Sequence, residues 1–417
     1  MTTRRMAAVD AQTFWMSRHV PNDQFLLYVF AGVPDGLAGV LARAQACEDL
    51  RLRIVDDSRW RYPKWVVGEV DSTQISMHRG SDLDWDGCLT AVAALADAQL
   101  DPRTAAWRLH VFASVLGAPG AVSPVSVAVL QISHALADGT RSAELAAWLF
   151  GRESPVVPVV SGRRGSLVLR SVAAARTHRA MVRDVQAGRL FGPGEPQPPL
   201  PTNAAPTGPR RIRTVVRQRC ELPRGRTVTV SVLVAIASAL DGYLRDIGAD
   251  PARLQAEVLI AKSGVRLAHN HFRNIGVALH PELAPDARGA AIDSELQAGR
   301  TRVQHPASVA ADRAFAATPA PLLRWGVGQF DPAARSPRVT GATAVSSVHR
   351  GAADLHFGTA PVLWTSGYPA LSPMMGLTHG VHGIGDMVAV SVHGADSAVD
   401  IDGYVAFLDA ALRRTSG

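Results

Sequence analysis

The spacing of apolar residues in the first half of the chain predicts a mixture of helices and strands. Apolar residues recur every three or four positions in four segments, which predicts helices over 36–48, 89–100, 140–150 and 166–188. Alternating or continuous apolar runs predict strands over 50–55, 64–70, 107–116 and 125–133. This alternation of the two periods is typical of an α/β protein.

The second half repeats the same mixture after a break. Strands are predicted over 212–221, 257–262, 275–281, 339–348 and 386–393, and helices over 230–247, 290–304, 308–315 and 396–413, with Ser308 as N-cap of the third helix. The break, 191–209, holds seven prolines and three glycines and predicts an extended linker. We therefore expect an N-terminal lobe (1–190), a proline-rich linker (191–210) and a C-terminal lobe (211–417).

Composition narrows the class of protein. The 417 residues are 47% hydrophobic and 19% charged, which is typical of a folded protein with a sizeable core. Lys64 and Lys262 are the only lysines among 43 basic residues, so the basic side chains are nearly all arginines. This bias has two interpretations, a GC-rich genome or a need for guanidinium groups that bind phosphate. A net charge of +7 and 6% aromatic residues argue against nucleic-acid binding.

No pattern in the chain predicts export or a membrane span. Cys47, Cys88 and Cys220 are far apart, which gives no disulfide framework. The first ten residues lack the apolar core of a signal peptide. The uncharged stretch 111–133 is interrupted by prolines and glycines, and the apolar run 228–240 is too short to span a bilayer. We expect a soluble, cytoplasmic protein, and contact with a membrane or lipid-droplet surface stays open.

One segment carries the pattern of an active site. A continuous apolar run, 125–132, ends at Ser133-His134, and Asp138-Gly139 opens the next predicted helix. A histidine at a strand end can remove a proton from a hydroxyl, because its pKa lies near neutrality. Asp138 can cap the helix or pair with an arginine, and Gly139 permits a sharp turn. The alternative interpretation is a structural histidine followed by an ordinary N-cap.

The segment from His134 to Gly139 resembles the His-x-x-x-Asp-Gly core of the wax ester synthase/diacylglycerol acyltransferase family, within the superfamily of chloramphenicol acetyltransferase and peptide-synthetase condensation domains. The resemblance extends along most of the chain and is that of an actinobacterial member. It includes Asp10 with Phe14, 107–112, 203–211, 227–240, 262–266, 270–279 and 376–386.

The resemblance implies a two-lobed, chloramphenicol acetyltransferase-like α/β fold with a tunnel between the lobes. It implies His134 as general base, supported structurally by Asp138, Gly139 and Arg266, with Arg266 as ion-pair partner of Asp138. Residues expected along the substrate tunnel are Ser133, Asn270, Asn274 and Ser347. Acyl-CoA is then the co-substrate, a diacylglycerol or long-chain alcohol is the acceptor, and no cofactor or metal is needed.

Three departures from the family pattern keep other functions open. Ser133 replaces the first motif histidine, Thr229-Val230 replaces an Asn-Asp pair, and 346–351 only approximates a Ser-Asn-Val-Pro-Gly-Pro segment. One alternative is a catalytically silent lipid-binding or carrier-docking protein of the same fold. Another is an acyltransferase that acts on a different hydroxyl or amine, such as that of a polyketide-type lipid.

Two further groups of residues have competing interpretations. Arg211, Arg213, Arg217 and Arg219 point to one side of the strand at 212–221, as a solvated face or as a stripe for phosphates or lipid headgroups. The spacing of His379, His382 and Asp386 could hold a metal, but the glycines around them favour a tightly packed loop. The His269-Asn-His271 segment is expected at a polar turn or cleft edge.

Overall fold

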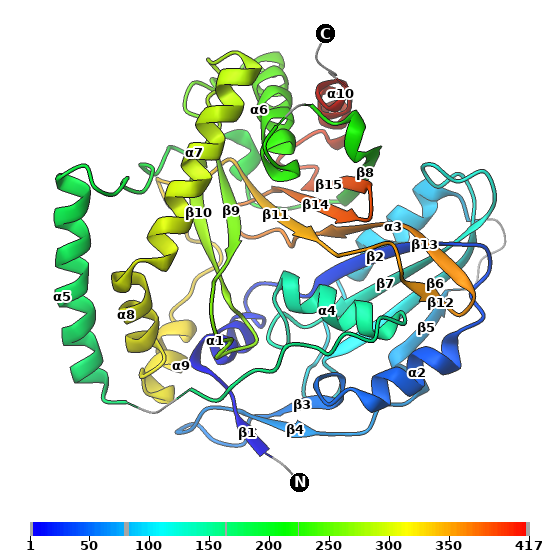
Figure 1. Cartoon of the computed structure of the whole chain (residues 1–417), viewed down its shortest axis with the longest axis horizontal. Helices are drawn as coiled ribbons and strands as arrows, with labels where there is room; N and C mark the ends of the chain where they lie inside the picture. Colours follow the sequence, from blue (N-terminus) through cyan, green and yellow to red (C-terminus); the bar gives the residue numbers. More distant parts are fainter. Residues whose placement is uncertain (1–2, 79–82, 163–164, 224, 414–417) are drawn as a thin grey trace.

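The first lobe is built on a six-stranded sheet in the order β12-β13-β2-β7-β6-β5. The computed structural model describes residues 3–78, 83–162, 165–223 and 225–413. The strands of this sheet are β2 (Gln24–Ala31), β5 (Ile75–His78), β6 (Trp107–Val115), β7 (Val125–Ile132), β12 (His356–Phe357) and β13 (Ala360–Tyr368). A small sheet below it in Figure 1 contains β1 (Thr3–Arg5), β3 (Leu52–Val55) and β4 (Lys64–Val67).

Both faces of the first sheet are covered. Leu26, Tyr28 and Phe30 of β2 enter one core together with residues of α1 (Ala8–Met16), α2 (Leu37–Ala46) and α4 (Gly139–Leu149). The alternate residues Leu27 and Val29 enter a second core with α3 (Trp85–Leu95). Successive side chains of a strand point to opposite faces, so a strand that is apolar from Phe25 to Ala31 needs this double cover.

The second lobe has a sheet in the order β10-β9-β11-β14-β15-β8. Its strands are β8 (Arg210–Gln218), β9 (Gln255–Ala261), β10 (Phe272–Ala278), β11 (Thr343–His349), β14 (Leu377–Ile384) and β15 (Met387–Ala395). One face is covered by α6 (Val228–Asp246), α7 (Pro285–Gln304) and α10 (Ile401–Leu412), which lie above it in Figure 1. α6 is long and apolar enough to cross a membrane, but 67% of its most apolar window is buried, as in a core helix.

Three helices lie along the side of the molecule, namely α5 (Leu167–Gln186), α8 (Pro306–Phe315) and α9 (Ala320–Gly328). α5 packs against α8, and α9 packs against α1. Pro306 occupies the first turn of α8, so the helix begins earlier than predicted and His305, not Ser308, is its N-cap. Short 3₁₀ turns complete the chain at η1 (Asp49–Arg51), η2 (Ser72–Gln74), η3 (Pro201–Asn203) and η4 (Arg219–Glu221).

The predicted boundary at 211–417 needs a correction, because part of the second half belongs to the first lobe. β13 pairs antiparallel with β2, with Thr365 opposite Tyr28, and β12 pairs with β13. Leu323 and Val327 of α9 enter the core of the first lobe as well. β2 lies inside its sheet and needs a partner on each side, and the chain supplies β13 as the second one.

The glycine-rich segment 376–386 is a strand, not the packed loop that we expected. β14 is buried at all eight positions and pairs with β11 and β15. A Cβ at Gly380 would lie 2.3 Å from the carbonyl oxygen of Gly367 on β13. Glycine is therefore required where strands of the two lobes cross closely.

Candidate active site

His134 lies where the first lobe meets the second. It follows β7 in a turn that leads into α4, and its side chain is half-buried. Its ring centroid is 5.6 Å from that of Phe272, which belongs to β10 of the second sheet. In Figure 1 the start of α4 lies below β9, β10 and β11. The histidine therefore faces the junction between the lobes.

The surroundings of His134 favour the neutral imidazole. Burial lowers the pKa of His134, against smaller opposing effects that include the charge of Asp138. Its Nδ1 atom is buried and has no hydrogen-bond partner among the described residues. Its main-chain oxygen accepts a hydrogen bond of 2.8 Å from Nδ2 of Asn270. A neutral ring with a fixed backbone can accept a proton near pH 7.

Asp138 joins the two lobes through its carboxylate. It caps α4 by accepting from the backbone N–H of Arg141 at 2.9 Å. It also accepts from Nη1 of Arg266 and from the backbone N–H of His271, both at 2.7 Å. The predicted ion pair of Asp138 and Arg266 is thus present. Burial on its own would raise the pKa of Asp138, but the hydrogen bonds and the charge of Arg266 lower it.

Asp10 forms a second connection that the sequence left without a role. Its side chain is 0% exposed and accepts hydrogen bonds from the backbone N–H groups of His269 and Asn270, each at 2.9 Å, and from Nδ2 of Asn270 at 3.1 Å. Burial raises the pKa of Asp10 to about 7. The same Asn270 amide bonds His134, so Asp10 positions the histidine through Asn270. The only signal in the sequence was the resemblance at Asp10 and Phe14.

The segment around His269 lies in the interior, not at a cleft edge. His269 is 1% exposed, and its Nδ1 lies 2.7 Å from the carbonyl oxygen of Leu136 in the turn after β7. Burial lowers the pKa of His269 well below its usual value. The loop between β9 and β10 is therefore fixed to the turn that carries His134.

Ser347 points away from the first lobe. Ser347 on β11 contacts Thr229 of α6, with 2.8 Å between the hydroxyl oxygens. The adjacent Ser346 lies on the opposite face of the strand, where its hydroxyl would be 3.8 Å from a Cβ placed at Gly139. Ser346 therefore faces the start of α4, whereas Ser347, which we expected along the substrate tunnel, faces α6.

We expected Gly139 to permit a sharp turn between the strand and the helix, but the turn does not use the conformational freedom of glycine at this position. Its φ is not positive, and it is simply the first residue of α4. A Cβ there would meet Cγ2 of Val348 at 3.4 Å, an ordinary van der Waals contact. A methyl group at this position would therefore fill the gap between α4 and β11.

The remaining predicted tunnel residues are divided. Ser133 is 4% exposed, and its backbone N–H donates to the carbonyl oxygen of Ala106 at 2.9 Å. Asn274 is exposed on β10 and donates to the carboxylate of Glu257 on β9 at 2.5 Å.

Glu257 is a polar group near the site that the sequence did not single out. Burial raises the pKa of Glu257. Phe272 and Asn274 share a face of β10, so Glu257 adds a polar group to the wall of the second lobe that His134 faces. No motif marked this residue.

A cavity of about 170 Å³ lies at the lobe junction but is not lined by His134. Residues of both halves line it, among them Asp23, Phe25, Tyr368 and His393. Asp23 accepts from the backbone N–H of Leu100 and from Nε2 of Gln131, both at 2.7 Å, and burial raises its pKa to about 6. None of the predicted site residues lines this cavity, so the expected tunnel past His134 stays a prediction.

The arginine stripe on β8 serves the packing of the second lobe. Arg211 and Arg213 form ion pairs with Asp396 and Asp402, at 3.0 Å and 2.8 Å. Arg217 pairs with Asp409 of α10. Arg219 lies exposed in η4. Three of the four arginines thus have carboxylate partners at α10 or just before it, which leaves no continuous free stripe for phosphates.

The histidines on β14 are divided between the two faces of the strand. His379 bonds the hydroxyls of Thr343 and Tyr404, each at 2.7 Å, on the side of α10. His382 lies three positions on and points to the opposite face, near Gly367. The two rings therefore cannot share one metal ion. Among the described residues, no group of three His, Cys, Asp or Glu side chains is placed to hold a metal.

Comparisons with solved structures identify the fold. The wax ester synthase/diacylglycerol acyltransferase from Marinobacter aquaeolei VT8 matches with a TM-score of 0.62 and 18% identity, over 98% of each chain. A mutant starter condensation domain of rhizomide synthetase, in complex with C8-CoA and Leu-SNAC, matches with a TM-score of 0.58 and 13% identity, over 99% of this chain and 93% of that one.

Sequence comparison adds no closer relative. No protein-family model matches the chain, and no curated protein matches it significantly. Two sheet-rich α/β lobes, with His134 and Asp138 at their junction, nevertheless agree with the expected architecture. The chain has the two-lobed, chloramphenicol acetyltransferase-like fold of wax ester synthases and condensation domains.

Proposed function

We propose that the protein is an acyltransferase that moves a fatty acyl group from acyl-CoA to the hydroxyl of a lipid alcohol, with His134 as general base. The observation that carries this proposal is the position of His134 at the lobe junction, where Asn270 fixes its backbone and burial keeps its ring neutral. The fold supports it, since one structural neighbour is named as an acyltransferase and another holds C8-CoA.

The chemistry requires one proton acceptor and no acyl-enzyme. A neutral His134 removes the hydroxyl proton while the oxygen attacks the thioester carbonyl and forms the new C–O bond. Collapse of the tetrahedral intermediate breaks the C–S bond, and the imidazolium returns the proton to the thiolate of CoA. Nε2 is the nitrogen that we assign to this step, because Nδ1 is buried.

Asp138 and Arg266 act as positioning residues in this proposal. Their ion pair holds the loop 262–271 against the turn that carries His134. We place the reaction in the cytoplasm and assign no cofactor beyond the co-substrate. A diacylglycerol or a long-chain alcohol is the acceptor that we favour, and another hydroxyl or amine, such as that of a polyketide-type lipid, is the alternative within the same chemistry.

A silent lipid-binding or carrier-docking protein is the second candidate function. The observation that favours it is Ser133, which stands where the family has a histidine and is itself buried. Thr229 likewise stands where the family carries the Asn of an Asn-Asp pair, and its hydroxyl is engaged in a hydrogen bond with Ser347.

A thiol-release assay separates the two. Purified protein with long-chain acyl-CoA and either diacylglycerol or a fatty alcohol should release free CoA, and His134→Ala should lower the rate by about 100-fold or more with an unchanged melting temperature. His356→Ala, at an exposed histidine of β12 that lines neither described cavity, serves as the matched control. Full activity of the His134 variant would overturn the mechanism, and no release with any acceptor alongside tight lipid binding would favour the silent protein.

A further inference from the structure

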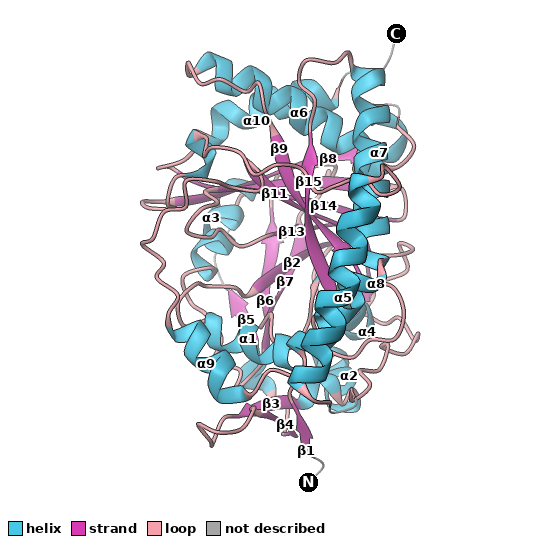
Figure 2. Ribbon diagram, turned by 90° about the vertical axis from the view of Figure 1, so that its left-hand side faces the viewer, coloured by secondary structure: helices cyan, strands magenta, loops and turns pink. Residues whose placement is uncertain are grey.

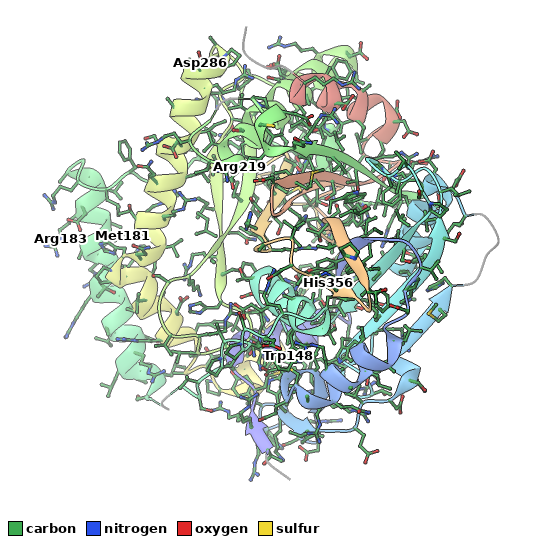
Figure 3. The ribbon with its side chains drawn as sticks, turned by 45° about the vertical axis from the view of Figure 1, so that its right-hand side comes forward. Trp148, Met181, Arg183, Arg219, Asp286 and His356 are labelled. Atoms are coloured by element: carbon green, nitrogen blue, oxygen red, sulfur yellow. The ribbon has the colours of Figure 1, made fainter. Side chains whose placement is uncertain are left out.

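Helix α5 lies on the outside of the molecule with no buried residue. It packs on α8 at the edge of the protein, as Figures 1 and 2 show from two directions. None of its 20 residues is buried. In Figure 3, Arg183 of this helix lies at the outer edge of the molecule. A helix of this length extends about 30 Å, which is a long element to leave uncovered.

The outward face of α5 is apolar as well as basic. At 100° per residue, Val168, Val172, Arg179 and Val182 share one side of the helix, opposite the residues that contact α8. Val168 is 70% exposed, and Leu169 at the edge of this face is 73% exposed. The remaining valines of this face are also exposed.

All charged side chains on the outward face of α5 are positive. Arg176, Arg179 and Arg183 line a surface groove together with Val182, and none of these arginines forms an ion pair within the described part of the chain. The helix has one acidic residue, Asp184, which lies on the inner side. Its partners are Arg189 at 2.7 Å and His305 at 3.5 Å. The outward face therefore presents three positive charges and no carboxylate.

We propose that the outward face of α5 is a docking surface for a membrane that contains anionic lipids. Arginines bind the lipid phosphates, while the valines and Leu169 between them enter the boundary of headgroups and acyl chains. Charge alone would also suit an acidic protein. The apolar side chains spaced along the whole helix favour a lipid surface, because a flat boundary can cover all of them at once.

This surface does not depend on the acyl-transfer proposal, and the two are tested separately. Flotation with vesicles requires no turnover. The full chain is mixed with vesicles of phosphatidylcholine alone or with about 30% phosphatidylglycerol, and the bound fraction is measured. Wild-type protein should float with the anionic vesicles and stay in solution with the neutral ones.

Three variants define the contribution of α5. R179E/R183E should lower the affinity for anionic vesicles by about tenfold or more, because two attractive charges become repulsive. V168S/V172S should lower it by several-fold at unchanged charge. R108E/R253E makes the same change in net charge at exposed positions outside α5 and should stay within about twofold of wild type.

Each other outcome overturns the proposal. Absence of wild-type binding removes the docking surface, whatever the result of the thiol-release assay. An equal loss in R108E/R253E would mean that net charge alone drives the binding. Wild-type affinity of V168S/V172S would show that the apolar side chains do not enter lipid and that the vesicles are held by charge alone.

Discussion

Asp10 and Asp138 are both buried, but the pKa of one is raised and that of the other is lowered. The difference is the counter-ion. Asp138 faces Arg266 at 2.7 Å, whereas Asp10 receives only amide N–H groups from His269 and Asn270. Amide dipoles offset only part of the cost of burying a carboxylate, and a guanidinium offsets more of it. The two aspartates therefore stabilise the junction over different ranges of pH.

Removal of the Asp138 carboxylate should be costly. Asp138→Ala leaves Arg266 buried and unpaired, so the free energy of unfolding should fall by about 3–5 kcal/mol, measured by urea denaturation. The thiol-release rate should fall as well, because the turn that carries His134 loses its anchor. The double variant Asp138→Ala/Arg266→Leu should recover part of the stability. A loss below about 1 kcal/mol in the single variant would contradict a structural role for this pair.

Asp10 should make stability depend on pH. Its pKa is raised to about 7 in the folded state, so the folded protein binds a proton that the unfolded chain releases above pH 3.8. This contribution to the free energy of unfolding is fully present below pH 3.8 and is lost as the pH rises to about 7. The free energy of unfolding should fall by about 4 kcal/mol over this interval. Unfolding measured from pH 4 to 8 should show a smaller decline for Asp10→Asn, while the exposed control Asp246→Asn keeps the wild-type decline. Equal slopes in both variants would exclude Asp10 as the source.

Among the elements, the long helices could be predicted and several strands could not. Apolar periodicity predicts α4, α5 and α6 within two residues of their observed bounds. β2 and β14 were not predicted. β2 is a continuous apolar run from Phe25 to Ala31, which fits a buried strand and a buried helix segment equally well, and β14 is interrupted by glycines. The reason for those glycines lies in another part of the chain, since β14 crosses β13 there.

The crossing of β13 and β14 should be intolerant of a side chain. Gly380→Ala would place a Cβ 2.3 Å from a carbonyl oxygen of the facing strand, which cannot move without shifting the backbone. We expect a loss of about 3 kcal/mol or more in the free energy of unfolding. Gly39→Ala in α2, where nothing lies within 4 Å, should be neutral or slightly stabilising in the same denaturation experiment. Similar stability of the two variants would contradict this packing.

At the scale of the whole molecule, the first lobe is built from both halves of the chain, so the two lobes are not separate segments of sequence. β13 completes the first sheet from the second half of the chain, and Leu323 of α9 completes its core. We therefore expect a single cooperative unfolding transition by calorimetry, although the architecture has two lobes. The fragment 1–190 should not fold alone, as judged by near-UV circular dichroism. A native-like fragment with its own cooperative transition would show that the lobes are independent.

The sequence by itself determined the α/β class, the proline-rich linker and the motif at His134 and Asp138. These features rest on local periodicity, on proline geometry and on a motif short enough to be read directly. Arg266 as the ion-pair partner came from the family resemblance, since no local pattern links two residues so far apart in the chain. Only the tertiary structure decided that β13 joins the first sheet, that Asp10 holds Asn270, and that Ser346 and not Ser347 faces α4. Each of these depends on which distant segments meet, and the local pattern of a strand does not specify its partner.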